Sequence, residues 1–215
     1  MAIGQIPRRL KAQDMIMKRL TRLARSEWGK LALLALLLFA GRSSLADHYH
    51  VPSGSMEYSL MPGDRVVVDK TAYGIRIPFT KIDLVDVARP RAGEIAVFDS
   101  PVDGTLLIKR IVAVGGDRVD LIDGRLSVND QPLASSNAPL LEHYDGRSWE
   151  LNLRDGGGPD IRGLVLPAGT VLAVGDHRGN SRDGRYFGLI DERELYGRAV
   201  AVYYSRIEGL RWKRL

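Results

Sequence analysis

Residues 106–128 read LLIKRIVAVGGDRVDLIDGRLSV, and this stretch indicates the fold class of the chain. The segment Leu106–Val114 is a nine-residue apolar run with two basic residues inside it, and its β-branched side chains favour a strand. Residues 118–128 alternate apolar and polar side chains on both sides of Asp123-Gly124. An Asp-Gly pair between two alternating segments predicts a two-residue β-hairpin. The stretch therefore predicts consecutive strands in an antiparallel arrangement.

Short strands and turns are expected over the whole chain after about residue 51. Nine of the ten prolines and twenty of the 23 glycines follow that position, and no convincing amphipathic helix is found there. The candidate strands are Arg65–Asp69, Glu94–Phe98, Leu106–Val114, Arg118–Leu121, Leu126–Val128, Leu164–Leu166, Val171–Val174 and Ala199–Tyr204. We therefore expect a mainly β, mostly antiparallel domain over residues 47–215, of the sandwich or open-barrel type.

The positive charge of the chain is concentrated at its N-terminus. The 215 residues carry a net charge of +5. Residues 1–30 hold eight basic and two acidic residues, which leaves a net charge of −1 for the rest of the chain. A nearly neutral body is not typical of a nucleic-acid-binding domain. We therefore interpret residues 1–27 as a basic cytoplasmic head. Its apolar residues share one helical face, which fits either a helix lying on anionic membrane lipids or a basic helix that is simply solvated.

An uninterrupted apolar run, LALLALLLFAG, follows the head at residues 31–41. Extended to residues 28–46, it becomes a nineteen-residue segment, about 28 Å long as a helix and close to the thickness of a bilayer core. We expect a single-pass transmembrane helix over 28–46, with the N-terminus in the cytoplasm because the basic residues precede the run. A signal peptide cleaved after Ser44-Leu45-Ala46 and a buried core helix are the alternatives.

Residue usage narrows the possible chemistry. The chain has no cysteine, which excludes a disulfide framework, a thiolate nucleophile and a cysteine-based zinc site. Its four histidines lack the spacing of a helical metal site. We expect neither a metal nor another cofactor.

Three segments carry candidate catalytic residues. Ser53 and Ser55 lie in the sequence PSGSM at residues 52–56, shortly after the apolar run. Lys109 shares one face of its predicted strand with aliphatic neighbours, and burial there would favour the neutral amine that a general base needs. The glycine-rich segment 175–188 combines polar groups and charges of both signs. Taken singly, each segment also has a simpler interpretation. Residues 52–56 fit a loop, Lys109 fits an edge-strand lysine that opposes aggregation, and residues 175–188 fit a surface turn.

Together, these segments resemble the bacterial type I signal peptidases, which are membrane-anchored serine–lysine endopeptidases. The motifs that carry the resemblance are Pro52-Ser53-Gly54-Ser55-Met56, Met61-Pro62-Gly63-Asp64, residues 91–98, Lys109-Arg110-Ile111-Val112 with Gly116-Asp117, and residues 175–188. They lie in order over most of residues 30–204.

The resemblance implies a role for each matching residue. Ser55 would be the nucleophile and Lys109 the general base, and Ser53 would add its hydroxyl to an oxyanion hole beside the backbone N–H of Ser55. Ser181 would orient the lysine, and a pair formed by Asp183 and Arg185 would support the loop. The family has a strongly twisted β domain on the outer, periplasmic face of the bacterial inner membrane. It cleaves exported preproteins after small-x-small sites.

The chain departs from the usual family pattern at several loop positions, which are Tyr58, Gly116, His177, Gly179 and Gly184. None of these departures removes a proposed catalytic group, but they bear on loop rigidity and pocket shape. The segment between residues 121 and 164 is shorter than the large insert of many Gram-negative members, so a compact form is expected.

Other interpretations of the same residues remain open at the level of sequence. Ser55 and His177 with Asp176 or Asp183 would form a serine–histidine–acid triad. A specialised, conjugative pilin-processing peptidase of the same family is a second possibility. A membrane-anchored β-rich binding module without catalysis is a third. A self-cleaving serine–lysine repressor would need a DNA-binding head, against which the apolar run argues.

Overall fold

The computed structural model describes residues 29–31, 34, 46–76, 83–86 and 88–215. The chain divides into two compact units, residues 1–43 and 44–215. In the first unit, residues 29–31 and 34 are helical. Among the described residues, no helix has the length and apolar character needed to cross a membrane. Most of the expected head and anchor, residues 1–46, lies outside the described residues.

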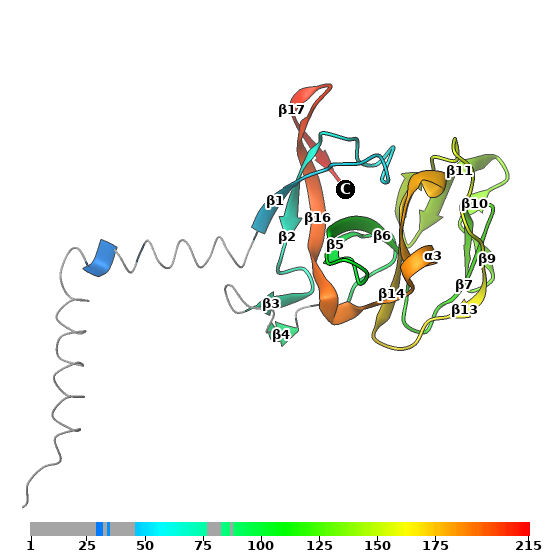
Figure 1. Ribbon diagram of the computed structural model, residues 1–215, viewed down its shortest axis with the longest axis horizontal. Helices are drawn as coiled ribbons and strands as arrows, with labels where there is room; N and C mark the ends of the chain where they lie inside the picture. The colour runs from blue at the N-terminus through cyan, green and yellow to red at the C-terminus, as the bar shows by residue number, and fades with distance from the viewer. Residues whose placement is uncertain (1–28, 32–33, 35–45, 77–82, 87) are drawn as a thin grey trace, which may run out of the picture. The chain divides into compact units, whose positions relative to one another are not determined.

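The second unit consists mainly of antiparallel β-sheet, as the sequence predicts (Figure 1). Its largest sheet has eight strands in the order β1-β2-β16-β5-β6-β14-β15, and β17 also pairs with β16. The strands of this sheet are β1 (Ala46–His50), β2 (Arg65–Asp69), β5 (Ile95–Asp99), β6 (Leu106–Val114), β14 (Thr170–Val174), β15 (Ile190–Asp191), β16 (Leu195–Ser205) and β17 (Gly209–Arg214).

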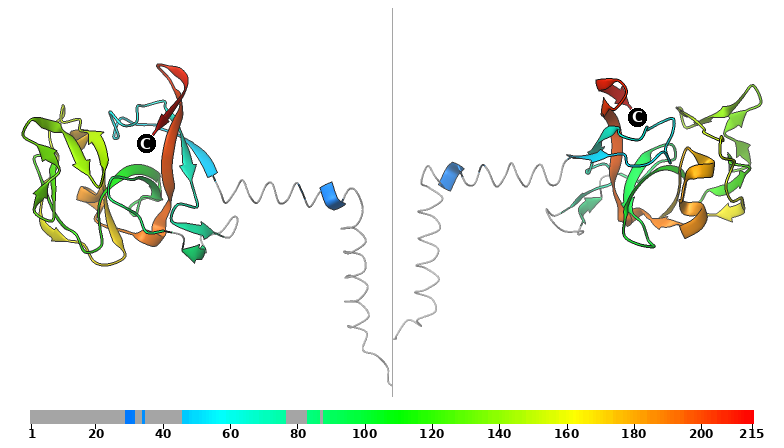
Figure 2. Two further views of the ribbon diagram at one scale, coloured as in Figure 1. Left: turned by 180° about the vertical axis from the view of Figure 1, so that it is seen from behind. Right: turned by 45° about the horizontal axis from the view of Figure 1, so that its top comes forward.

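Three smaller sheets complete the described strands. Two of them lie together at the end of this unit away from β17 in both views of Figure 2. One sheet contains β13 (Ile161–Val165), β7 (Arg118–Ile122), β8 (Arg125–Val128) and β9 (Gln131–Pro132), and the next contains β10 (Ala134–Ser135), β11 (Ala138–Tyr144) and β12 (Arg147–Glu150). The third sheet pairs β3 (Gly74–Arg76) with β4 (Asp83–Asp86). The short helices are α3 (Gly184–Phe187) and the 3₁₀ turns Arg178–Asn180 and Glu192–Glu194.

The hairpin predicted around Asp123-Gly124 is present. β7 pairs with β8 through Ile122 and Arg125, and both turn residues have positive φ angles, 50° and 75°. A two-residue hairpin turn of this kind requires such φ angles, which Asp and Gly tolerate. The alternation places Leu121 and Leu126 in a buried core together with Trp149 of β12.

The central strand β6 is buried on both faces from Lys109 to Ala113. It pairs with β5 on one side and with β14 on the other. Ile111 packs in the core around Phe98, whereas Val112 belongs to the core around Trp149. This position between two cores explains why two consecutive basic residues of β6, Lys109 and Arg110, are both removed from water.

Candidate active site

Ser55 lies in the loop that joins β1 to β2. The ends of this loop are tied together by the bond from Val51 N–H to the Asp64 carbonyl, at 2.9 Å. Met56 and Leu60 are fully buried and anchor the loop in the core that underlies β2. Burial of these two apolar side chains fixes the turn, so Ser55 is held against the protein with only 8% of its surface exposed.

The buried Lys109 amine meets the Ser55 hydroxyl. Nζ of Lys109 lies 2.6 Å from Oγ of Ser55, and the lysine is 3% exposed. Its cross-strand partner on β5 is the small residue Ala96, which is fully buried. Burial lowers the pKa of Lys109 to about 8, although Asp183 and Asp176 partly oppose the shift. A lysine with such a pKa is partly neutral near neutral pH and is able to accept a proton.

The Ser53 hydroxyl lies on the exposed side of the same turn. Its Oγ is 3.5 Å from Oγ of Ser55, which is at the outer limit of a hydrogen bond. Ser53 is exposed to solvent. The turn therefore places a solvent-accessible hydroxyl beside that of Ser55.

The loop 175–188 packs directly onto the Ser55 turn. The backbone N–H of His177 donates to the Ser55 carbonyl at 3.1 Å. Gly175 is wedged between Ser55 and Ser181, because a Cβ at this position would lie 2.5 Å from the Ser55 carbonyl oxygen and 2.3 Å from Ser181 Oγ. The Ser181 hydroxyl is buried, and its oxygen completes no hydrogen bond among the described residues.

Asp183 and Arg185 form a buried pair, in line with the predicted ion pair. Nε of Arg185 donates to one oxygen of Asp183 and NH2 to the other, both at 2.8 Å. Asp183 also accepts from the backbone N–H of Gly175 at 2.9 Å. Burial opposes ionisation of Asp183, but the Arg185 guanidinium and the Gly175 N–H hold its pKa below the ordinary value. The pair thus attaches the start of the loop to α3.

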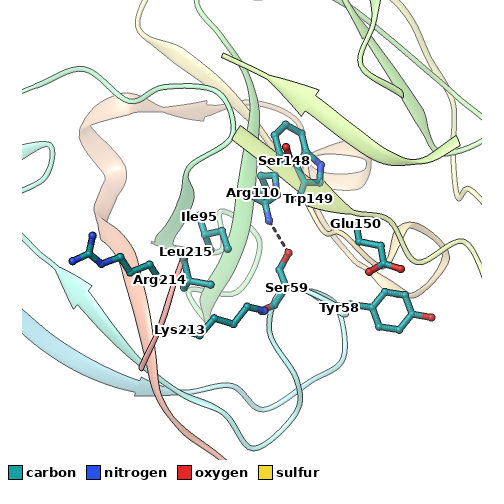
Figure 3. A pocket seen from close by; sticks show the side chains of 10 residues that line it. All are labelled: Tyr58, Ser59, Ile95, Arg110, Ser148, Trp149, Glu150, Lys213, Arg214 and Leu215. Atoms are coloured by element: carbon teal, nitrogen blue, oxygen red, sulfur yellow. Dashed lines mark hydrogen bonds between the residues drawn. The ribbon is translucent and has the colours of Figure 1, made fainter. Parts of the chain in front are cut away.

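Arg110 points to the other face of β6 and makes a second pair. It donates to both oxygens of Asp176, at 2.8 and 2.7 Å. It also donates to the Ser59 hydroxyl at 2.8 Å, as Figure 3 shows. Its guanidinium carbon also lies 4.6 Å from the centre of the Trp149 ring. Arg110, Ser59 and Trp149 border a cavity of about 220 Å³ whose lining does not include Ser55 or Lys109.

A third buried pair joins the loop to the small sheets. NH2 of Arg178 lies 2.6 Å from Oε2 of Glu142, and both side chains are fully buried. Glu142 also accepts from Trp149 Nε1 at 2.7 Å and from the Leu126 N–H at 3.0 Å. Sequence reasoning missed Glu142, because its partner lies 36 positions away and its strand has no clear alternation.

The histidine of the alternative triad is engaged elsewhere. The His177 ring is buried, with Nδ1 3.3 Å from a Glu57 oxygen and Nε2 2.9 Å from an Asp155 oxygen. The two acids considered for a triad, Asp176 and Asp183, are each bound to an arginine. The geometry therefore favours Lys109 over His177 as the partner of Ser55. Within the described residues, no three His, Asp or Glu side chains converge as a metal site.

Comparison with known families decides where the chain belongs. The family described as "Signal peptidase, peptidase S26" matches residues 25–204. The chain belongs to this signal peptidase family. Two similar relatives are the signal peptidase I of Pseudomonas aeruginosa, 31% identical, and that of Pseudomonas fluorescens, 32% identical. Each alignment covers 83% of this chain and 72% of the relative.

A solved structure of a signal peptidase I from Enterococcus faecalis is also similar to this S26 family member. It is 24% identical, with a TM-score of 0.38, and the match covers 53% of this chain and 98% of that chain. The family matched by the sequence is the one that the motif resemblance indicates, so that prediction is confirmed.

Proposed function

We propose that this S26 family member is a membrane-bound serine endopeptidase that removes signal peptides from exported preproteins through a Ser55–Lys109 dyad. The single observation that carries the proposal is the 2.6 Å contact between the buried Lys109 amine and the Ser55 hydroxyl. A serine nucleophile needs an adjacent base, and a desolvated lysine meets that need. Membership of the signal peptidase family supports the choice of substrate.

The reaction follows from these positions. Neutral Lys109 accepts the Ser55 proton as Oγ attacks the scissile carbonyl, and the backbone N–H of Ser55 and the Ser53 hydroxyl stabilise the oxyanion. The protonated lysine then gives its proton to the leaving amine, which leaves an acyl-enzyme on Ser55. Lys109 next activates a water that hydrolyses the ester. In this scheme Ser181 orients Lys109, while Asp183 and Arg185 keep the loop in place.

Substrate binding is proposed to use strand addition. β1 is the terminal strand in the described order of the large sheet, and the chain runs from its end at His50 into the Ser55 turn. An extended preprotein segment that pairs along this edge would be guided to the nucleophile. Shallow pockets at alternate positions would then admit the small residues of a small-x-small site.

Residues 28–46 are proposed to anchor the enzyme in the bacterial inner membrane, with the basic head in the cytoplasm against anionic lipids. The catalytic domain would then lie on the periplasmic face, close to the end of a signal peptide's apolar segment.

Cleavage of a purified preprotein tests the proposal. Wild type is expected to release the signal peptide, whereas Ser55→Ala and Lys109→Ala are expected to fall to background. His177→Ala is expected to keep cleavage well above background, at a reduced rate. Equal background cleavage by wild type and Ser55→Ala would favour the non-catalytic binding module. Retained activity in Lys109→Ala with loss in His177→Ala would favour the triad.

A further inference from the structure

The carboxylate of Glu57 lies against the backbone that carries the nucleophile. Glu57 is two residues after Ser55, and its N–H closes a tight turn on the Gly54 carbonyl at 3.1 Å. A Cβ at Gly54 would be 2.5 Å from Oε1 of Glu57, so the carboxylate packs on the Cα of the residue before Ser55. The Glu57 side chain is 22% exposed. A negative charge is thus held, largely out of water, beside the nucleophile turn.

Two side chains approach the other oxygen of this carboxylate. Nδ2 of Asn152 donates to Oε2 of Glu57 at 3.2 Å, and Nδ1 of His177 lies 3.3 Å from the same atom. The His177 ring is 5% exposed, and its Nε2 lies 2.9 Å from Oδ2 of Asp155. The imidazole is therefore enclosed between two carboxylates, one on the nucleophile turn and one on the loop after Leu151.

His177 is doubly connected to the nucleophile turn. Its backbone N–H donates to the Ser55 carbonyl, and its ring meets Glu57. The backbone bond does not depend on the type of side chain at position 177, but the ring contact does. The chemistry specific to His177 is therefore directed at the Glu57 carboxylate.

We propose that His177 is a positioning residue for the nucleophile turn, whose buried ring holds the Glu57 carboxylate against Gly54. This inference rests on the proposed function. Without the ring, the Glu57 carboxylate loses the contact that confines it and has room to leave Gly54, which moves the turn. A displaced turn misplaces the Ser55 hydroxyl and its backbone N–H relative to the scissile carbonyl. This effect acts on the transition state more than on substrate binding.

The contact with Asp155 is expected to matter less. Its side chain is 56% exposed, so water solvates the carboxylate when the imidazole is absent. Asp155→Asn is therefore predicted to change kcat less than His177→Leu does.

A pair of substitutions of similar size compares a polar with an apolar side chain at position 177. His177→Asn keeps a polar group close to the position of Nδ1, whereas His177→Leu has none. We expect His177→Leu to lower kcat about tenfold with KM changed less than about twofold, and His177→Asn to keep kcat within about threefold of wild type. His143→Leu, which removes an exposed ring that contacts Ser148, is the matched control and is expected to leave kcat unchanged.

A double-mutant cycle separates positioning from mere filling of space. His177→Leu is expected to lower kcat about tenfold in the presence of Glu57 but less than about threefold in a Glu57→Gln background, because the contact between the ring and the carboxylate is then already removed. An equal loss in both backgrounds would overturn the proposal, as would an unchanged kcat in His177→Leu. Thermal unfolding and titration of active sites show that each variant is folded and correct the rates for inactive protein.

The pH profile distinguishes His177 from the proposed base. Burial, Asp183, Asp176 and Arg185 set the pKa of Lys109, so the acid limb of kcat/KM is expected to stay near pH 8 in His177→Leu. A displaced limb would show that His177 acts through Lys109 and would overturn the inference. Failure of the proposed function gives a different result, because cleavage by wild type and by Ser55→Ala would then be equal.

Discussion

Lys109 Nζ and Ser55 Oγ lie 2.6 Å apart, although 54 positions separate the two residues in the sequence. Ser55 reaches this position because Met56, the next residue, is fixed in the core, and Lys109 because β6 is the buried partner of β5. Both side chains are buried, with 8% of Ser55 and 3% of Lys109 exposed. The proposed dyad is thus held together by the same burial that lowers the pKa of the lysine.

The first prediction concerns the effect of Lys109 on stability. The pKa of Lys109 is about 8 in the folded protein and 10.5 as its ordinary value. Between these pH values the unfolded state binds more protons, so stability rises with pH, and the penalty is fully present below about pH 8. Lys109→Met is therefore expected to be more stable than wild type at pH 7, by at most about 3 kcal/mol, and to lose cleavage activity.

Urea unfolding of both proteins at pH 7 and pH 10 measures this difference. The advantage of Lys109→Met is expected to shrink at the higher pH, where the lysine is neutral in the folded protein and partly neutral in the unfolded chain. An advantage that does not change with pH would point to packing rather than to the charge.

Ser53→Ala tests the second proposed donor to the oxyanion. The hydroxyl is close to Ser55 and open to solvent, so its removal is expected to leave the fold intact. Loss of one oxyanion donor lowers kcat by about 10²-fold in known cases, and we expect a similar loss with little change in KM. Ser53→Thr, which keeps the hydroxyl, is the control. Wild-type kcat in Ser53→Ala would exclude this role.

Gly175→Ala tests how closely the loop must approach the nucleophile. The added methyl group would fall 2.5 Å from the Ser55 backbone oxygen, and a backbone atom does not move aside as easily as a side chain. We expect at least a tenfold loss of kcat/KM, which a displaced turn accounts for, and reduced thermal stability. Gly104→Ala, where a Cβ meets open space but φ is 70°, controls for backbone strain. It is expected to lower stability and to leave kcat/KM unchanged, and an equal loss of kcat/KM in the two variants would contradict the argument.

Glu142→Gln tests the buried pair with Arg178. The substitution keeps the size of the side chain but leaves the fully buried guanidinium without its anion. Removing one partner of a buried ion pair destabilises a protein by about 3–5 kcal/mol, and urea unfolding measures the change. Glu194→Gln, at an exposed position of the 3₁₀ turn Glu192–Glu194, is expected to change stability by less than about 0.5 kcal/mol. A small effect at Glu142 would show that the pair is not needed for stability.

The sequence predicted the strands whose residues follow a regular pattern. Arg65–Asp69 and Leu106–Val114 have the predicted bounds, and the other predicted strands differ at their ends. For example, the predicted Leu164–Leu166 is Ile161–Val165, which contains a glycine and pairs with β7 through an irregular register. The strands of the sheet that holds β11 were missed, because β11 is mostly exposed and lacks a clear alternation.

The motifs in the sequence predicted the pairs of residues at the centre of the candidate site. Ser55, Lys109, Asp183 and Arg185 were all named from the sequence, and the structure brings each pair together. The contact of Glu57 with His177 was not foreseen, because a glutamate in a loop carries no pattern that reveals burial. Such contacts depend on how distant loops pack, which local sequence does not specify.

The pH dependence of kcat/KM for preprotein cleavage by wild type tests the central claim most directly. This quantity reports the ionisation of the free enzyme. If neutral Lys109 is the base, kcat/KM rises about tenfold per pH unit at acidic pH and levels off above about pH 8, with activity lost as the lysine is protonated. The claim would be contradicted if kcat/KM levelled off near pH 6.5, the ordinary range of a histidine, and if this ionisation were absent from the profile of His177→Ala.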